Sequence, residues 1–194
     1  MHSFLKIYYF IDEFNRQEIQ KLNKNITLIY RNYKGNCNLK SIKKIKDLCL
    51  KQNREFYISN NLKVAINLNL NGVYIPAFKK ICNYKNLSTK KNFKIIGSAH
   101  NIAELKNKEK QGCNIIFISP LFKTKKSNYF LNINRFNLIA KNSKKEIGAI
   151  GGINSSNCKK LRLTKSITFA SISWIKKNRP KNIGRFFKYS KSIN

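Results

Sequence analysis

Short apolar runs alternate with amphipathic stretches along most of this chain. The apolar runs are rich in β-branched and aromatic residues and predict strands at residues 4–11, 26–30, 55–58, 72–75, 93–96, 114–118, 147–150 and 168–172. Between them, apolar residues at helical spacing predict helices at residues 15–22, 39–50, 62–70, 101–111, 135–140 and 154–161. Residues 76–92 and 123–132 are polar and are expected to form loops.

Strands that alternate with helices pair in parallel and are joined by right-handed crossovers. Eight such units are the number that closes a (β/α)8 TIM barrel, so the predicted fold class is α/β with a single barrel. We assign residues 1–178 to the barrel and residues 179–194 to a basic C-terminal tail.

Small and polar residues end the predicted strands, where a parallel barrel places its ligand site. After the seventh strand, Gly151-Gly152-Ile153 leads into a predicted helix, and the eighth strand ends in Ile172-Ser173. Glycine lets backbone N–H groups approach an anion closely, and barrel phosphate sites are commonly built after strands seven and eight. These five residues are therefore candidates for binding a phosphate; the alternative is that the glycine pair only makes a tight turn.

The charge of the chain is extreme, at +32 with 40 Lys and Arg against 8 Asp and Glu. Such charge can indicate a nucleic-acid partner. The Lys residues are spread along the whole chain, however, and far outnumber Arg, which nucleic-acid sites favour for bidentate contacts. A compositional bias explains this better, so no nucleic-acid partner is expected, although the charge would attract phosphorylated ligands.

Five isolated cysteines, none in a C-x-x-C pair, predict buried thiols in a reduced, cytoplasmic protein. The N-terminal apolar run lacks the basic start and small-residue cleavage site of a signal peptide. No apolar run reaches the length of a membrane span, so no membrane partner is expected. The sequence is compatible with a homo-oligomer.

The strand ends together resemble the thiamine phosphate synthase/TenI family. The segments that carry the likeness are IIGSAHN, GCNIIFISPLFKT, IGAIGGIN and FASIS, with looser matches at YYFIDEF and LIYR. The resemblance covers about residues 4–177 and implies a (β/α)8 barrel. It also implies an enzyme of thiamine biosynthesis, which joins hydroxymethylpyrimidine pyrophosphate to thiazole phosphate and releases pyrophosphate with the help of Mg²⁺.

Carried over position by position, the resemblance implies roles for individual residues. Gly152, Ile153, Ile172 and Ser173 would hold the thiazole phosphate. Arg31 and Ser98 would face the pyrophosphate, and Thr124 would lie where the two ligands join.

The sequence departs from the family pattern where the metal and pyrophosphate would bind. The Asn-Asp pair reads Ser59-Asn60, and the run carrying the second metal aspartate ends in Lys79. Two lost carboxylates predict a weakened Mg²⁺ site, with Asn60 as the only candidate ligand. The lysine of the R-x-K motif is displaced to Lys34, and Lys126 replaces imperfectly the lysine of the loop after the sixth strand.

Lysine side chains could neutralise the leaving pyrophosphate in place of the metal, and Lys63, Lys79 and Lys126 are the candidates. Lys34 is also expected on the pyrophosphate side. The alternative is that they are solvated surface lysines. His100 is expected to order the loop after the fifth strand, and the adjacent acids Asp12 and Glu13 to be polar groups at a strand end.

Three functions remain open from the sequence. The first is a divergent thiamine phosphate synthase-like transferase that acts on small phosphorylated ligands. The second is a non-catalytic or regulatory barrel that binds thiazole phosphate or thiamine phosphate. The third, which rests on charge alone, is a basic RNA-associated protein.

Overall fold

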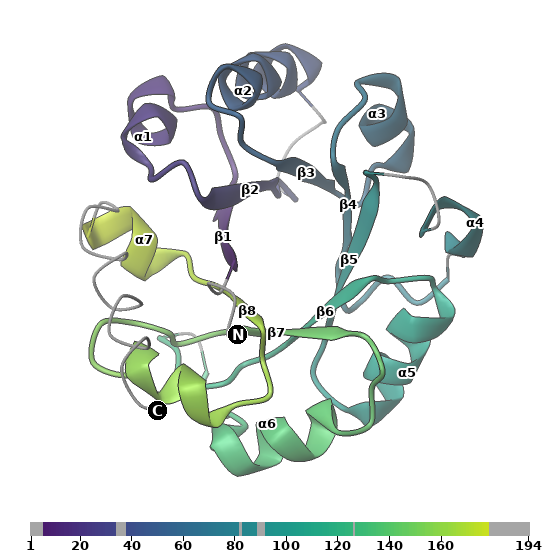
Figure 1. The fold of residues 1–194 in the computed structure, drawn as a ribbon, viewed down its shortest axis with the longest axis vertical. Helices are drawn as coiled ribbons and strands as arrows, with labels where there is room; N and C mark the ends of the chain where they lie inside the picture. Colours follow the sequence, from purple (N-terminus) through teal and green to yellow (C-terminus); the bar gives the residue numbers. More distant parts are fainter. Residues whose placement is uncertain (1–5, 34–37, 82, 89–91, 126, 179–194) are drawn as a thin grey trace, which may run out of the picture.

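Eight parallel strands close into a barrel in the order of the chain (Figure 1). The structure is a computed structural model that describes residues 6–33, 38–81, 83–88, 92–125 and 127–178. The strands are β1 (Lys6–Ile11), β2 (Ile26–Tyr30), β3 (Phe56–Ser59), β4 (Gly72–Ile75), β5 (Lys94–Ala99), β6 (Ile115–Ile118), β7 (Glu146–Ile150) and β8 (Thr168–Ala170). The barrel closes where β1 pairs with β8 in the register Lys6↔Thr168 and Ile7↔Phe169. The predicted (β/α)8 fold is confirmed.

Helices surround the barrel and cover its outer face (Figure 1). They are α1 (Arg16–Lys21), α2 (Leu39–Lys51), α3 (Leu62–Asn67), α4 (Lys85–Ser88), α5 (Ile102–Lys110), α6 (Asn132–Ala140), the 3₁₀ helix η1 (Cys158–Leu163) and α7 (Ser173–Asn178). Within the described ranges, none of these helices is long and apolar enough to cross a membrane. The proposed tail, residues 179–194, lies outside the described residues.

Alternating strand residues build two hydrophobic layers. Those that point inward fill the barrel with side chains, among them the aromatic rings of Tyr8, Phe10, Tyr57, Tyr74 and Phe117. Those that point outward pack against the helices in a larger cluster. The barrel is therefore a packed core, and ligands are confined to the loops at its carboxyl end.

Asparagine, abundant in this chain, has defined structural tasks. Four helices begin at an Asn whose side chain accepts a hydrogen bond from the backbone N–H three residues on: Asn15, Asn38, Asn61 and Asn101. Among the described residues, every non-glycine residue with a positive φ is also an asparagine: Asn53, Asn60, Asn69, Asn92 and Asn132. Asparagine tolerates this left-handed conformation better than most residues, so it takes the place of glycine in these turns.

Two sequence predictions were wrong in the last quarter of the chain. The helix expected at 154–161 is a turn at 154–157 followed by η1. There the Asn154 and Asn157 side chains bond the local backbone, which competes with an α-helix. The helix α7 was not predicted; it buries Trp174, whose ring stacks on Phe169 of β8 at 6.2 Å, and Ile175.

The buried thiols are confirmed where the structure describes them. Cys49, Cys113 and Cys158 are buried and form no disulfide, whereas Cys37 and Cys82 lie outside the described residues.

Candidate active site

A glycine turn follows β7 at the carboxyl end of the barrel. Gly151 and Gly152 have φ angles of +98° and +69°, in the region that favours glycine. A Cβ on Gly152 would lie 2.4 Å from the carbonyl oxygen of Lys123 and 2.5 Å from that of Phe122. The turn therefore packs backbone against backbone on the loop after β6, which explains the glycine pair whether or not a ligand binds.

The end of β8 is fixed to this turn by Ser171. Its hydroxyl donates a hydrogen bond to the Ile153 carbonyl oxygen at 3.0 Å, and its N–H donates to the Tyr8 carbonyl oxygen at 3.2 Å. Ser171 is buried, whereas the next residues, Ile172 and Ser173, are exposed. The structure thus brings together the residues predicted to bind a phosphate.

Backbone N–H groups that have no hydrogen-bond partner among the described residues gather at these two strand ends. Within the described part of the chain, the N–H groups of Gly152, Ile153, Ile172 and Ser173 donate no hydrogen bond to another protein group. Backbone N–H groups of this kind can form an anion-binding concavity. We name this set of four residues the N–H cradle.

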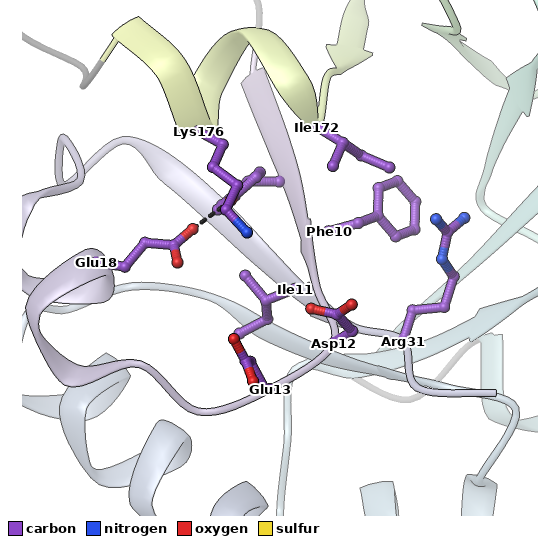
Figure 2. Close-up of a pocket in the computed structure, with 9 residues that line it drawn as sticks. Phe10, Ile11, Asp12, Glu13, Glu18, Arg31, Ile172 and Lys176 are labelled. Carbon is purple, nitrogen blue, oxygen red and sulfur yellow. Dashed lines mark hydrogen bonds between the residues drawn. The ribbon is translucent and has the colours of Figure 1, made fainter. Parts of the chain in front are cut away.

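Arg31 lies across the mouth, directly after β2. Its backbone N–H donates to the Ile11 carbonyl oxygen at 2.7 Å, and its guanidinium carbon lies 4.5 Å from the centre of the Phe10 ring. This cation–π contact positions the charge while the side chain stays partly exposed. Arg31 and Ile172 line one pocket, shown in Figure 2, so a predicted pyrophosphate residue and a predicted phosphate residue share a cavity.

The other wall of this pocket carries three acidic residues and Lys176 of α7. Asp12 and Glu13 follow β1 as exposed polar groups, as predicted, and Glu18 on α1 accepts a hydrogen bond from the Tyr9 hydroxyl (Figure 2). Burial, together with the bond to Glu18, raises the pKa of Tyr9 above its usual value. Tyr9 is therefore a neutral donor at physiological pH.

Ser98 lies deeper, inside the barrel. It is 6% exposed and accepts a hydrogen bond from the Tyr74 hydroxyl at 2.9 Å. Burial raises the pKa of Tyr74 to about 12, so Tyr74 stays protonated and donates to Ser98. One residue past β5, the His100 ring Nδ1 and backbone N–H both bond Glu104, a loop-ordering role that agrees with the prediction.

Thr124 lies in the loop that packs on the glycine turn. Its N–H bonds the Ser127 carbonyl oxygen at 3.4 Å, and its hydroxyl accepts from the Ser127 N–H at 3.2 Å. The carbonyl oxygen of the preceding residue, Lys123, lies against Gly152, so Thr124 is one residue along the chain from a contact with the N–H cradle. The neighbouring Lys126 and the other displaced lysine, Lys34, lie outside the described residues.

Asn60 and Lys79 follow β3 and β4. Asn60 has a φ of +57°, is exposed, and its N–H donates to the Tyr74 carbonyl oxygen at 2.8 Å. Lys79 is partly buried, and its carbonyl oxygen accepts from Lys108 Nζ at 2.8 Å and Gln111 Nε2 at 3.0 Å.

Sequence reasoning missed Lys108. It is fully buried on α5, and its ammonium group also donates to the Pro76 carbonyl oxygen at 2.8 Å and to Gln111 Oε1 at 2.9 Å. It thereby fixes the loop after β4, which carries Lys79. Its helix is strongly charged, so nothing in the sequence distinguishes Lys108 from its exposed neighbours.

The residues at the ends of β3 and β4 do not fit a magnesium ion. The Ser59 hydroxyl is shared with the Tyr33 hydroxyl at 3.3 Å, and Asn60 offers a single amide oxygen. Mg²⁺ prefers an octahedral set of oxygens with one or two carboxylates. Within the described ranges, no group of three or more His, Cys, Asp or Glu residues could hold a metal ion.

The strands form a closed parallel barrel, and the candidate site lies at their carboxyl ends. These two features place the protein in the class of (β/α)8 barrels that bind ligands at this end. Within that class, the family model described as thiamine monophosphate synthase matches residues 16–175. The chain belongs to this thiamine monophosphate synthase family.

Similar proteins carry the same description. The chain is 32% identical over 130 residues to the thiamine-phosphate synthase of Prochlorococcus marinus strain SARG, which covers 62% of this chain and 35% of that protein. It is 33% identical over 128 residues to that of strain AS9601, which covers 61% of this chain and 34% of that protein. The chain thus spans about a third of the length of the curated relatives it matches.

Among solved structures, thiamine phosphate pyrophosphorylase from Pyrococcus furiosus superposes with a TM-score of 0.74 at 17% identity, covering 97% of this chain and 98% of the other. The corresponding enzyme from Bacteroides thetaiotaomicron gives a TM-score of 0.61 at 18% identity, with 96% of each chain covered. At this identity, the likeness establishes the shared fold.

Proposed function

We propose that this barrel acts in thiamine biosynthesis and joins hydroxymethylpyrimidine pyrophosphate to thiazole phosphate, with release of pyrophosphate. Membership of the thiamine monophosphate synthase family supports this assignment. The single observation that carries it is the arrangement of the mouth, where the N–H cradle and Arg31 lie around one barrel end.

The N–H cradle is proposed to hold the thiazole phosphate. Backbone N–H groups are fixed donors, so they bind an anion without ordering long side chains. Ser171 keeps the two strand ends together through its bond to the Ile153 carbonyl oxygen. Thr124, next in the chain to Lys123, would then face the join between the two ligands.

The reaction balances without a proton transfer. The lone pair of the thiazole nitrogen forms a bond to the pyrimidine methylene carbon. The bond from that carbon to oxygen breaks, and its electron pair leaves on pyrophosphate. The product ring carries the positive charge, and pyrophosphate gains negative charge as it departs.

Arg31 is proposed to stabilise the departing pyrophosphate. A positioned guanidinium offers forked donors to phosphate oxygens, and such a preorganised charge is most effective where charge develops in the transition state. Its stacking on Phe10 fixes the guanidinium before substrate binds. No step is assigned to a metal ion, because the residues at the ends of β3 and β4 do not fit one.

The test is product formation by the purified chain supplied with both substrates, together with thiazole phosphate binding by calorimetry. We expect thiamine phosphate to accumulate and Arg31→Ala to reduce kcat/KM by about 100-fold, in the range for removing one preorganised donor. Thiazole phosphate binding should be little changed in that variant, because the N–H cradle is intact. Binding of both substrates without turnover would contradict the proposal and favour the non-catalytic barrel.

A further inference from the structure

Three large aliphatic side chains lie exposed on neighbouring segments, α6 and the stretch from η1 to β8. Leu138 on α6 is 61% exposed, Leu163 at the end of η1 is 58% exposed, and Ile167, just before β8, is 53% exposed. Single exposed apolar residues are ordinary, whereas several on adjoining segments indicate an interaction surface.

The side chain of Asn137 joins these segments to each other. Its Nδ2 donates a hydrogen bond to the Leu163 carbonyl oxygen at 2.9 Å, and its Oδ1 accepts one from the Lys165 N–H at 2.8 Å. The N–H of Ile167 in turn donates to the Ile147 carbonyl oxygen of β7 at 2.9 Å. The backbone that presents the three aliphatic side chains is therefore fixed, so little backbone entropy is lost when a partner binds.

Basic residues flank the aliphatic ones. Lys141 follows Leu138 by three residues at the end of α6, and Arg162 and Lys165 lie on either side of Leu163 along the chain. All three basic side chains are exposed. We give one name, the basic aliphatic face, to the set Leu138, Lys141, Leu163, Lys165 and Ile167.

Acidic residues near this face are few. Within residues 132–167 the sequence contains a single acidic residue, Glu146. Glu109 of α5 reaches the turn after α6, where it accepts a hydrogen bond from the Ser143 hydroxyl at 2.6 Å, but Lys106 pairs with it at 3.2 Å. The basic aliphatic face therefore keeps a positive charge.

The face lies away from the barrel mouth. Lys141 follows α6 on the way to β7, and Lys165 and Ile167 precede β8, so these residues belong to connections at the amino-terminal end of the strands. Ligands of a (β/α)8 barrel bind at the carboxyl end. The proposed function leaves the basic aliphatic face unused, and a partner bound there leaves the mouth open.

The composition of the face favours one kind of partner. Protein interfaces are enriched in aromatic residues and Arg and depleted in Lys, and sites for single-stranded nucleic acid use aromatic stacking. A second copy of this chain would bring together two like charges of +32. Aliphatic side chains flanked by lysines instead match a bilayer surface, where apolar burial and attraction to anionic headgroups act together.

We propose that the basic aliphatic face binds the surface of an anionic lipid bilayer. Leu138, Leu163 and Ile167 enter the boundary between headgroups and acyl chains, and Lys141 and Lys165 contact the lipid phosphates. Contact of this kind requires no spanning helix. It is independent of the proposed function, because it uses none of the residues at the mouth.

The experiment is co-sedimentation of the purified full chain with lipid vesicles. One set of vesicles consists of phosphatidylcholine alone, and the other contains phosphatidylcholine mixed with phosphatidylglycerol. We expect the chain to sediment with the mixed vesicles and to remain in solution with the neutral ones. Added NaCl should weaken the binding, because salt screens the attraction between lysines and headgroups.

Alanine variants test the aliphatic contribution. Leu163→Ala should lower the partition coefficient by about fivefold, and the triple variant with Leu138→Ala and Ile167→Ala by at least about 50-fold. Leu50→Ala is the matched control, since Leu50 is 66% exposed on α2, across the barrel from α6 (Figure 1), and its variant should bind as the wild type does.

A second pair of variants tests the basic contribution. Lys165→Gln should lower the partition coefficient by about fivefold, the effect of one lysine near an anionic surface. Lys51→Gln, an exposed change on α2 that alters the net charge equally, should have little effect. Circular dichroism of each variant confirms that a loss of binding is not a loss of fold.

The inference is overturned if the wild-type chain does not sediment with the mixed vesicles. It is also overturned if the triple variant binds them as Leu50→Ala does, because adsorption would then depend on net charge alone. Binding of an RNA duplex without binding of vesicles would assign the charge to nucleic acid and refute it as well. Formation of thiamine phosphate should be unchanged in the triple variant, so neither result depends on the proposed function.

Discussion

One buried polar side chain, that of Lys108, fixes a loop at the mouth of the barrel. Lys108 is fully buried, and its ammonium group satisfies carbonyl oxygens in the loop after β4. That loop carries Phe78 and Lys79, which follow the end of β4. A buried charge is tolerated only when it is hydrogen-bonded in this way, so Lys108 links the packing of α5 to the position of the site.

Replacing this lysine should destabilise the protein. Lys108→Met keeps the length of the side chain and leaves the Pro76 carbonyl oxygen without the Lys108 donor. We expect the free energy of unfolding to fall by about 3 kcal/mol, measured by urea denaturation. Lys110→Met, on the same helix but exposed, should change it by less than about 0.5 kcal/mol. Equal stability of the two variants would show that the Lys108 hydrogen bonds contribute nothing.

The sequence identified several site residues and missed others for a physical reason. Arg31, Gly152 and Ser173 follow strand ends, so position along the chain was enough to place them at the mouth. Lys108 and Tyr33 were missed because their environments come from distant segments: Lys108 is buried by the loop after β4, and Tyr33 contacts Phe78 across β3.

At the scale of elements, the glycine turn after β7 and the loop after β6 form one unit. The turn leaves no room for a side chain at Gly152, because the carbonyl oxygens of Phe122 and Lys123 lie where its Cβ would be. Any displacement of the turn therefore also moves the loop that carries Thr124.

Gly152→Ala should consequently weaken phosphate binding. The added Cβ must push the β6 loop away, and alanine at a positive φ costs about 1–2 kcal/mol in addition. We expect the Kd for thiazole phosphate, measured by calorimetry, to rise at least about tenfold. Ser155→Ala, an exposed change in the next turn, is the control and should bind as the wild type does. Unchanged affinity in Gly152→Ala would show that the N–H cradle does not bind the phosphate.

Elements whose apolar pattern is set locally were predicted well. The range of β2 is the predicted one, and β4 also matches, because a run of apolar residues between polar turns allows little else. The helical stretch after β7 was mistaken for an α-helix because the competing bonds of Asn154 and Asn157 leave no periodic signal. Helix α7 depends on packing Trp174 against β8, a contact that the local sequence does not show.

For the whole molecule, tyrosine ionisation should limit stability at high pH. Four buried tyrosines have raised pKa values, chiefly because burial disfavours the charged form: Tyr8, Tyr9, Tyr57 and Tyr74. Tyr74 rises from 10.0 to about 12. Above pH 10 the unfolded chain loses these protons while the folded chain keeps them, so stability falls as pH rises.

The free energy of unfolding should therefore be insensitive to tyrosine ionisation below pH 10 and should decrease between pH 10 and about 12. Each tyrosine contributes about 1.4 kcal/mol per pH unit in that window. Urea denaturation at a series of pH values checks this, and Tyr74→Phe should show a shallower slope than wild type. A flat profile up to pH 12 would mean that the aromatic layer inside the barrel is open to water.

The net charge is also a property of the whole molecule. The formal charge of +32 gives the chain a positive field that would attract phosphorylated ligands to its surface. The specific chemistry, however, depends on a few groups at the strand ends, because a charge spread along the chain does not select one ligand geometry.

The most direct test is formation of thiamine phosphate by the purified chain from hydroxymethylpyrimidine pyrophosphate and thiazole phosphate, followed chromatographically with Mg²⁺ and with a chelator. We expect product in both conditions, with strong loss in Arg31→Ala and Gly152→Ala. A folded wild-type chain that forms no product in either condition would contradict this expectation.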